Sequence, residues 1–158
     1  MLLVVMSAAV FGSQIDLKTK LQTSYDEVEK LILRKDIRGV SKLLTETRTS
    51  DYILDAKSGK HALTDVIRSL STVLPTFDKV TRATVHIDHL TVKGPIVIAT
   101  ITANLVLATK PLQDGKVHTI AEEATGDDTW VRVGDKWKLK LSKVLKSTFY
   151  RDGKQTKG

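Results

Sequence analysis

The segment from Asp127 to Leu141 restricts the fold of this chain more than any other. Polar and apolar residues alternate on both sides of Gly134-Asp135, and each arm carries one tryptophan, Trp130 or Trp137. Alternation places successive side chains on opposite faces of a strand, and a glycine-containing pair between two such runs favours a tight turn. The segment therefore predicts an antiparallel hairpin with one face in the core.

The rest of the chain divides into a helical first half and an extended second half. Apolar residues recur every three or four positions after Asp16 and again from Leu63 to Leu74, which is the period of an amphipathic helix. A short helix is expected after Asp36, whose carboxylate can cap its N-terminus. Alternating and β-branched residues predict strands at residues 51–55, 81–92, 96–109, 117–133 and 136–148. This order predicts an α+β domain, with three helices packed on a mainly antiparallel sheet that bends at Gly126.

Size and composition indicate one globular domain without a metal or a cofactor. A chain of 158 residues with 41% hydrophobic residues can form a core of its own. Cysteine is absent, which excludes disulfides and zinc–thiolate sites, and His86 and His89 would lie on opposite faces of a strand. The net charge of +7 is spread along the chain rather than clustered, so we expect a solvated basic surface and no nucleic-acid partner.

The first residues, from Met1 to Phe11, form an apolar run that is followed by Gly12-Ser13. A bilayer-spanning helix needs about 20 residues, so no integral membrane association is expected. An apolar run followed by small residues is typical of a secretory signal, and residues 1–13 are therefore predicted to be a signal peptide of a secreted or periplasmic protein. In the alternative, the run is an apolar helical turn that packs on a cytoplasmic domain.

The order helix, helix, strand, helix and four strands resembles the SnoaL-like branch of the nuclear transport factor two superfamily. The residues that carry the resemblance are Lys35-Asp36, Asp51-Tyr52-Ile53-Leu54-Asp55, Gly59 and the hairpin from Trp130 to Trp137. The resemblance covers residues 16–149 and leaves residues 150–158 as a polar tail that is expected to fray.

The resemblance implies a cone-shaped half-barrel, in which a strongly curved sheet wraps around a long helix and a pocket opens at the wide end. Superfamily members include isomerases, dehydratases, cyclases and non-catalytic proteins, and they commonly dimerise through the outer face of the sheet. The activity has to be argued from the pocket residues, because one fold carries many functions. The outer face of the second long strand is predicted to bear Ile98, Thr100, Thr102, Asn104 and Val106.

Pairing across the last hairpin identifies the predicted core face. Opposed residues in an antiparallel pair point to the same side. A two-residue turn at Gly134-Asp135 pairs Leu139 with Trp130. The same register pairs Leu141 with Asp128. The side of Trp130, Leu139 and Leu141 is then the core face. Trp130 either borders the pocket or packs in the core, and a large aromatic residue on a core face more often packs.

A turn at Asp114-Gly115 places an acidic residue on this core face. It pairs Leu107 with Glu122, and it brings Leu105 to the same side of the sheet. An apolar cavity disfavours the charged form of a carboxylate, which raises its pKa and suits it to general acid or base chemistry. Glu122 is therefore a catalytic candidate and Leu105 and Leu107 are predicted pocket residues. In the alternative, Glu122 is solvated or ion-paired at the rim.

A third turn, at Lys93-Gly94, adds His86 and Asp88 to the concave side as further catalytic candidates. Tyr25 on the first helix and Asp51 on the first strand are expected near the pocket mouth as hydrogen-bonding partners. In the alternative, the turn is one residue longer, and the side chains that face inward are those of Val85, Ile87 and His89.

The sequence thus supports three hypotheses of different classes. The first is a protein that binds a small apolar or amphipathic molecule in the cone. The second is an isomerase, dehydratase or cyclase that uses Glu122 or Asp88 as a general base. The third is a non-catalytic module that forms a homodimer through its outer sheet face.

Overall fold

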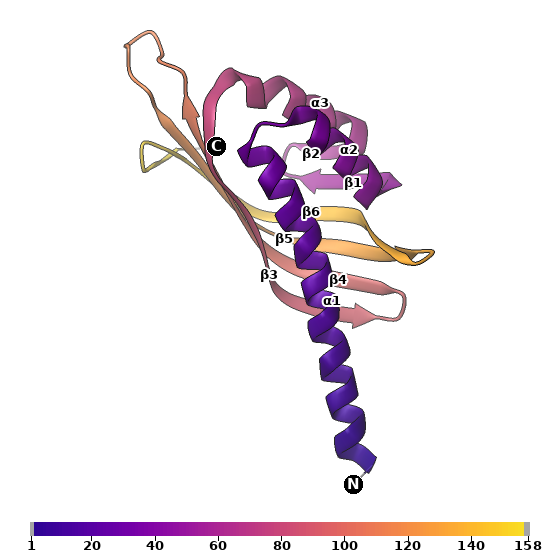
Figure 1. Ribbon diagram of the computed structural model, residues 1–158. Coiled ribbons are helices and arrows are strands. Elements are labelled where there is room, and N and C mark those ends of the chain that lie inside the picture. The colour runs from indigo at the N-terminus through magenta and orange to yellow at the C-terminus, as the bar shows by residue number, and fades with distance from the viewer. Residues whose placement is uncertain (1, 157–158) are drawn as a thin grey trace.

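The computed structural model describes residues 2–156, with side chains from residue 14 onward (Figure 1). Its elements follow the predicted order and confirm the α+β class. They are α1 (Leu2–Leu33), α2 (Ile37–Thr47), β1 (Arg48–Ala56), β2 (Gly59–Ala62), α3 (Leu63–Val73), the 3-10 turn η1 (Leu74–Thr76), β3 (Phe77–Lys93), β4 (Ile96–Thr109), β5 (Thr119–Val133), β6 (Lys136–Arg151) and β7 (Lys154–Thr156).

The N-terminal helix includes the segment predicted to be a signal peptide. Its backbone is helical from Leu2 onward, whereas Met1 and the side chains of residues 2–13 lie outside the described residues. The signal therefore stays a prediction. Among the described residues, no helix combines the length and the apolar character needed to cross a bilayer.

The seven strands form one curved, open sheet in the order β2-β1-β6-β5-β4-β3, with β7 paired to β6. Only the pairing of β1 with β6 is parallel. Figure 1 shows α1 running across one side of this sheet, with α2 and α3 beside β1 on that same side. The expected cone-shaped half-barrel with three helices is confirmed.

Helix α1 is fixed to the sheet through the backbone of β3, the strand at the open edge. The Gln22 side chain donates to the Val85 carbonyl at 2.6 Å and accepts from the Ile87 N–H at 3.0 Å. Glu29, two helical turns further along, accepts a hydrogen bond from the Val85 N–H. Edge strands expose backbone groups that need partners, so these contacts both satisfy the edge and place the helix.

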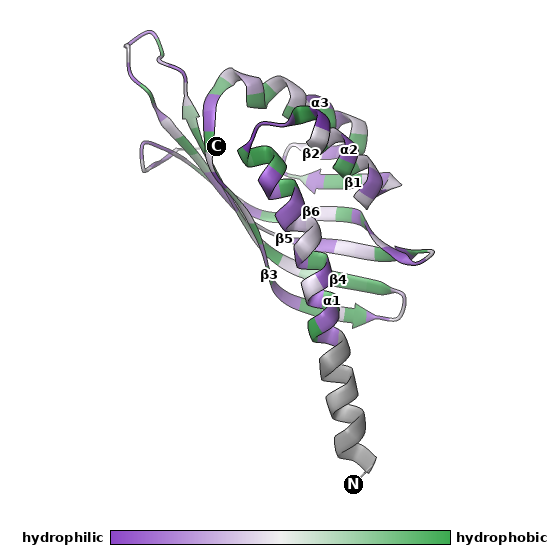
Figure 2. Ribbon diagram, in the orientation of Figure 1, coloured by the Kyte–Doolittle hydropathy of each residue, from purple (hydrophilic) through white to green (hydrophobic). Residues whose placement is uncertain are grey.

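The main core lies between α1 and the concave face of the sheet. Trp130 is 1% exposed and meets the ring of Tyr25 edge-to-face, with 5.6 Å between ring centres. The predicted pairing of Trp130 with Leu139 is confirmed, and both residues are in this core. Figure 2 shows hydrophobic and hydrophilic residues alternating along the strands, as expected for a sheet with one buried face.

Two bulges in the β5–β6 pair change the face of several residues. Trp130 pairs with Leu139, but the preceding Thr129 pairs with Leu141, so Lys140 is an extra residue on β6. The prediction that Leu141 lies on the core face was therefore wrong, because one inserted residue exchanges the two faces of a strand. Beyond the bulge, Ser142 pairs with Asp128.

The second bulge lies at the predicted bend, Gly126. A Cβ atom at this position would lie 2.6 Å from the backbone oxygen of Lys143 on the neighbouring strand. Only a glycine permits this close approach without displacing the backbone. The bulge and the close approach together bend β5 and β6 around α1, which opens space on the concave side.

The predicted tail is ordered over residues 151–156 by a short hairpin and by His118. Strand β7 pairs with the end of β6, so the expected fraying was wrong for this part, while residues 157–158 lie outside the described residues. The His118 ring lies 2.6 Å from an Asp152 carboxylate oxygen and 2.9 Å from one of Asp114. These hydrogen bonds, first that of Asp152, raise the pKa of His118 and connect the β4–β5 loop to the chain end.

Candidate functional site

A cavity of about 310 Å³ lies between α1 and the concave face of the sheet. Most of its wall is apolar, formed by Val28, Ile32, Leu54, Ala83, Val85, Ile101, Ala103, Leu105, Ala124, Leu139 and Val144. Polar residues also line it, among them Tyr25, Glu29, Arg48, Glu122, Asp128 and Ser142. Strands β1 and β3 to β6 and helix α1 all contribute, so the cavity depends on the curvature of the whole sheet.

Asp128 on β5 is the central polar residue of the cavity. It is 3% exposed, and within residues 14–156 no other charged residue is buried. The Tyr25 hydroxyl donates to Oδ2 of Asp128 at 2.5 Å, and the indole N–H of Trp130 donates to the Tyr25 oxygen at 3.1 Å. Burial raises the pKa of Asp128 and that of Tyr25. The neutral acid is the form that this environment favours.

Arg48, the first residue of β1, supplies a positive charge near this acid. Its guanidinium carbon lies 6.0 Å from the centre of the Tyr52 ring, and Nη1 donates to the Thr47 hydroxyl at 2.7 Å. Burial lowers the pKa of Arg48. Burial has the largest effect on the pKa of Asp128 and raises it. Two neighbours lower this pKa by a smaller amount: Ser142, which lies opposite Asp128 in the β5–β6 register, and Arg48.

The structure keeps Glu122 on the concave face, with a different strand register from the predicted one. Glu122 lines the cavity and pairs with Leu105 rather than Leu107. The turn at Asp114-Gly115 is part of a longer loop between Thr109 and Thr119, which shifts the register by two residues and preserves the face. The Ser147 hydroxyl donates to Oε1 of Glu122 at 2.7 Å.

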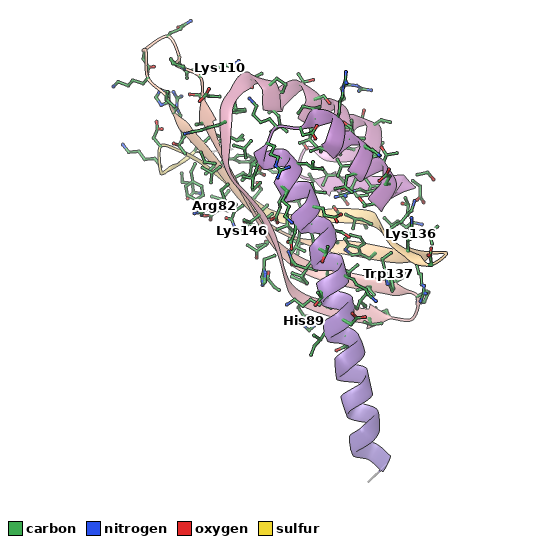
Figure 3. All side chains as sticks on the ribbon, viewed as in Figure 1. Arg82, His89, Lys110, Lys136, Trp137 and Lys146 are labelled. Carbon is green, nitrogen blue, oxygen red and sulfur yellow. The ribbon has the colours of Figure 1, made fainter. Side chains whose placement is uncertain are left out.

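His86 and Asp88 lie outside the cavity. The β3–β4 turn is Gly94-Pro95, one residue later than predicted, because Lys93 pairs with Ile96. Both His86 and Asp88 are exposed, on the side of the sheet away from the helices. The predicted inward orientation was wrong, because Ile87 pairs with Ile101 and His89 with Thr100, which leaves Asp88 as an extra residue on β3. One inserted residue exchanges the two faces of a strand. Figure 3 shows the neighbouring His89 on that outer side, as well as Arg82 and Lys146.

The predicted pocket residues are distributed over three environments. Tyr25 and Leu105 line the cavity. Trp130 lies in the core directly behind Tyr25, and Leu107 belongs to a separate core cluster near the 3-10 turn. Asp51 is exposed and forms an ion pair with Lys140 at 3.2 Å. Tyr25 alone of these five residues contacts Asp128 by a hydrogen bond.

The sequence analysis missed Asp128 and Arg48 as site residues. Asp128 precedes the buried Trp130 by two positions in one strand, which places both on the same face. That alternation was a usable signal. Arg48 lies at the junction of α2 and β1, where no periodicity predicts its direction. In the part of the chain that the structure describes, no three histidine or acidic side chains are grouped so that they could hold a metal ion.

Comparison with known proteins identifies the fold. No family model and no curated protein matches the chain. Among solved structures, a type 2 hexachlorocyclohexane dehydrochlorinase (LinA) is 11% identical, with coverage of 87% of this chain and 90% of its own, at a TM-score of 0.65. The Kfla4162 protein of Kribbella flavida is 14% identical, with coverage of 79% and 88%, at a TM-score of 0.64.

A third similar structure names the superfamily. It is a nuclear transport factor 2-like superfamily protein of Salmonella enterica serovar Typhimurium, 10% identical, with coverage of 92% of this chain and 96% of its own, at a TM-score of 0.59. The chain therefore has the nuclear transport factor 2-like fold. Identities this low establish the fold and leave the activity to the residues of the cavity.

Replacing Asp128 by asparagine tests the buried acid. Burial raises its pKa in the folded state above the ordinary value of 3.8, so its contribution to stability is full below that value and is lost as the pH rises through the folded pKa. Asparagine does not titrate. We expect the free energy of unfolding of the parent protein to fall relative to that of Asp128→Asn by up to about 1.4 kcal/mol per pH unit in this window.

Urea denaturation at a series of pH values between about 4 and 9 measures this difference. Asp135→Asn, in the exposed β5–β6 turn, is the matched control and should follow the parent protein at every pH. Parallel stability curves for the parent protein and Asp128→Asn would contradict a raised pKa at Asp128.

Proposed function

We propose that this protein binds a small apolar or amphipathic molecule in its cavity. The observation that carries the proposal is the cavity itself: about 310 Å³, with a mostly apolar wall and a few convergent polar groups. Ligand-binding cavities commonly have this size and this distribution of polar groups. Tyr25, Asp128 and Ser142 lie close together at one part of the wall, so a bound molecule would direct its polar end there.

Filling the cavity tests the proposal. Ala103 lines it from the middle of β4, and the phenyl ring of Ala103→Phe would occupy the ligand volume. We expect the uncharged fluorescent probe N-phenyl-1-naphthylamine to bind the parent protein and to lose about tenfold or more in affinity for Ala103→Phe, because the apolar contact area is no longer accessible. Fluorescence titration measures both affinities.

Ala62→Phe introduces the same side chain at an exposed position outside the cavity and serves as the control. It should bind the probe as the parent protein does. Equal probe affinities for Ala103→Phe, Ala62→Phe and the parent protein would show that the probe binds elsewhere, and the proposal would fail.

Proton-transfer catalysis is a second candidate function, and the buried Asp128 favours it. A carboxylate with a raised pKa in a largely apolar site is a stronger base than one in water. Glu122, which lines the cavity from the same strand as Asp128, remains the alternative base. The reaction classes that need such a base are isomerisation, dehydration and cyclisation. One of the structures with this fold is a dehydrochlorinase, which is consistent with the proposal.

A reporter of base strength distinguishes the two carboxylates. 5-Nitrobenzisoxazole opens to a cyanophenolate when a base removes its ring proton, so it reports on a base without requiring the natural substrate. If Asp128 is the base, Asp128→Asn should lower the rate by about a hundredfold, whereas Glu122→Gln should leave it nearly unchanged. The reverse result would assign the role to Glu122, and a parent rate no higher than that of free acetate would reject catalysis.

We also propose a homodimer formed through the outer sheet face. Ile98 and Val106, on the outer face of β4, are only half-exposed, and the intervening outer side chains of this strand are uncharged. Such a surface is suited to a self-complementary interface.

Sedimentation velocity should give the mass of a dimer for the parent protein. Thr102→Lys, which introduces like charges at the interface, should shift the measured mass to that of the monomer. A monomeric parent protein at high concentration would contradict this proposal.

A further inference from the structure

Arg48 is a cavity residue whose charge the proposed function does not explain. It lines the same wall as Asp128 and Tyr25, and its side chain is half-buried. A guanidinium has five N–H groups. One of them donates to Thr47, and the guanidinium carbon lies over the Tyr52 ring. Among residues 14–156, no other acceptor forms a side-chain hydrogen bond with Arg48.

The carboxylates of the cavity do not neutralise this cation by direct contact. Asp128 is near enough to influence the charge on Arg48, but the two do not form an ion pair within 4.0 Å among the described residues. Glu29 is occupied by the Val85 N–H, and Glu122 by the Ser147 hydroxyl. The cavity therefore holds a cation with free hydrogen-bond donors next to an acid that its surroundings favour as neutral.

A partly buried guanidinium without a counter-ion is costly, and an incoming anion would offset that cost. The planar, forked arrangement of its N–H groups matches the two oxygens of a carboxylate better than a spherical ion. A neutral Asp128 would not repel such a group, and the Tyr25 and Ser142 hydroxyls lie beside it. The apolar wall beyond these groups, at Ala103 for example, fits a hydrocarbon body.

We infer that the ligand of this cavity is an organic acid with an apolar body, whose carboxylate is bound by Arg48 and whose body lies along the apolar wall of β4. This inference rests on the proposed function, because it names the class of molecule that occupies the same cavity. It differs from a purely structural role of Arg48, in which the guanidinium packs on Tyr52 and leaves ligand charge irrelevant.

Matched probes test the inference on the unmodified protein. Octanoate and 1-octanol share the same alkyl chain and differ in the charge of the head group. We expect octanoate to bind about tenfold or more tightly than 1-octanol, because charge-assisted hydrogen bonds to a guanidinium are formed only with the anion. Titration followed by the methyl NMR signals of Ile101 and Leu105 measures both affinities at the cavity wall.

Variants assign the preference to Arg48. Arg48→Met keeps an unbranched side chain over Tyr52 and removes the charge, so it should lower octanoate affinity about tenfold or more and 1-octanol affinity much less. Arg48→Lys keeps the charge without the fork and should give an intermediate octanoate affinity. Lys136→Met removes the same charge at the far end of the β5–β6 hairpin, where Figure 3 shows Lys136, and should change neither.

The outcomes separate this inference from the proposed function. If 1-octanol binds and octanoate shows no advantage, the inference is overturned and the proposed function stands. If neither probe shifts the Ile101 and Leu105 signals, both are overturned. If Arg48→Met loses both probes equally, or if it does not fold and the unmodified protein shows no preference for the anion, Arg48 has a structural role only. An octanoate preference that Arg48→Lys retains in part supports the inference.

Discussion

The hydrogen bond from Tyr25 to Asp128 is the interaction on which the rest of the cavity depends. It joins the first helix to the middle of the sheet across a sequence separation of 103 residues. A buried acid without a partner would cost several kcal/mol, about the net stability of many domains. Tyr25 can satisfy Asp128 only when α1 lies across the concave face. The indole N–H of Trp130 donates to the Tyr25 oxygen, which continues this series of hydrogen bonds into the core and fixes the phenol ring.

Curvature supplies the second constraint, because a flat sheet would pack directly against α1 and leave no space. The bulge at Gly126 and the close approach of Lys143 bend β5 and β6, and the extra residue Lys140 adds a second irregularity. At the open edge, Gln22 and Glu29 hold α1 against β3. The helix is therefore fixed at the edge and at the centre of a bent sheet, and the cavity lies between these two attachments.

How far the sequence predicts this molecule depends on where the chain departs from a strict alternation. The order of elements, the hairpin pairing of Trp130 and the bend at Gly126 follow from local patterns, and they are confirmed. Glu122 stays on the predicted face because its register error was two residues, which preserves the face. His86 and Asp88 lie on the other face because a bulge at Asp88 adds one residue to β3. The alternation of side chains along a strand does not show where a bulge inserts an extra residue, so the sequence pattern alone does not predict these changes of face.

Arg48 and Asp128 also constrain each other, which decides how binding and catalysis relate in this site. The positive charge of Arg48 favours ionised Asp128, whereas burial favours the neutral acid. A carboxylate bound at Arg48 would cancel the favourable charge and add a repulsive one, so it would raise the pKa of Asp128 further. Asp128 is then a hydrogen-bond donor to the bound acid. An uncharged ligand leaves Arg48 available to stabilise ionised Asp128 as a base. If both proposals hold, the same pair of side chains would support anion binding and base chemistry with different ligands, and not with one ligand at the same time.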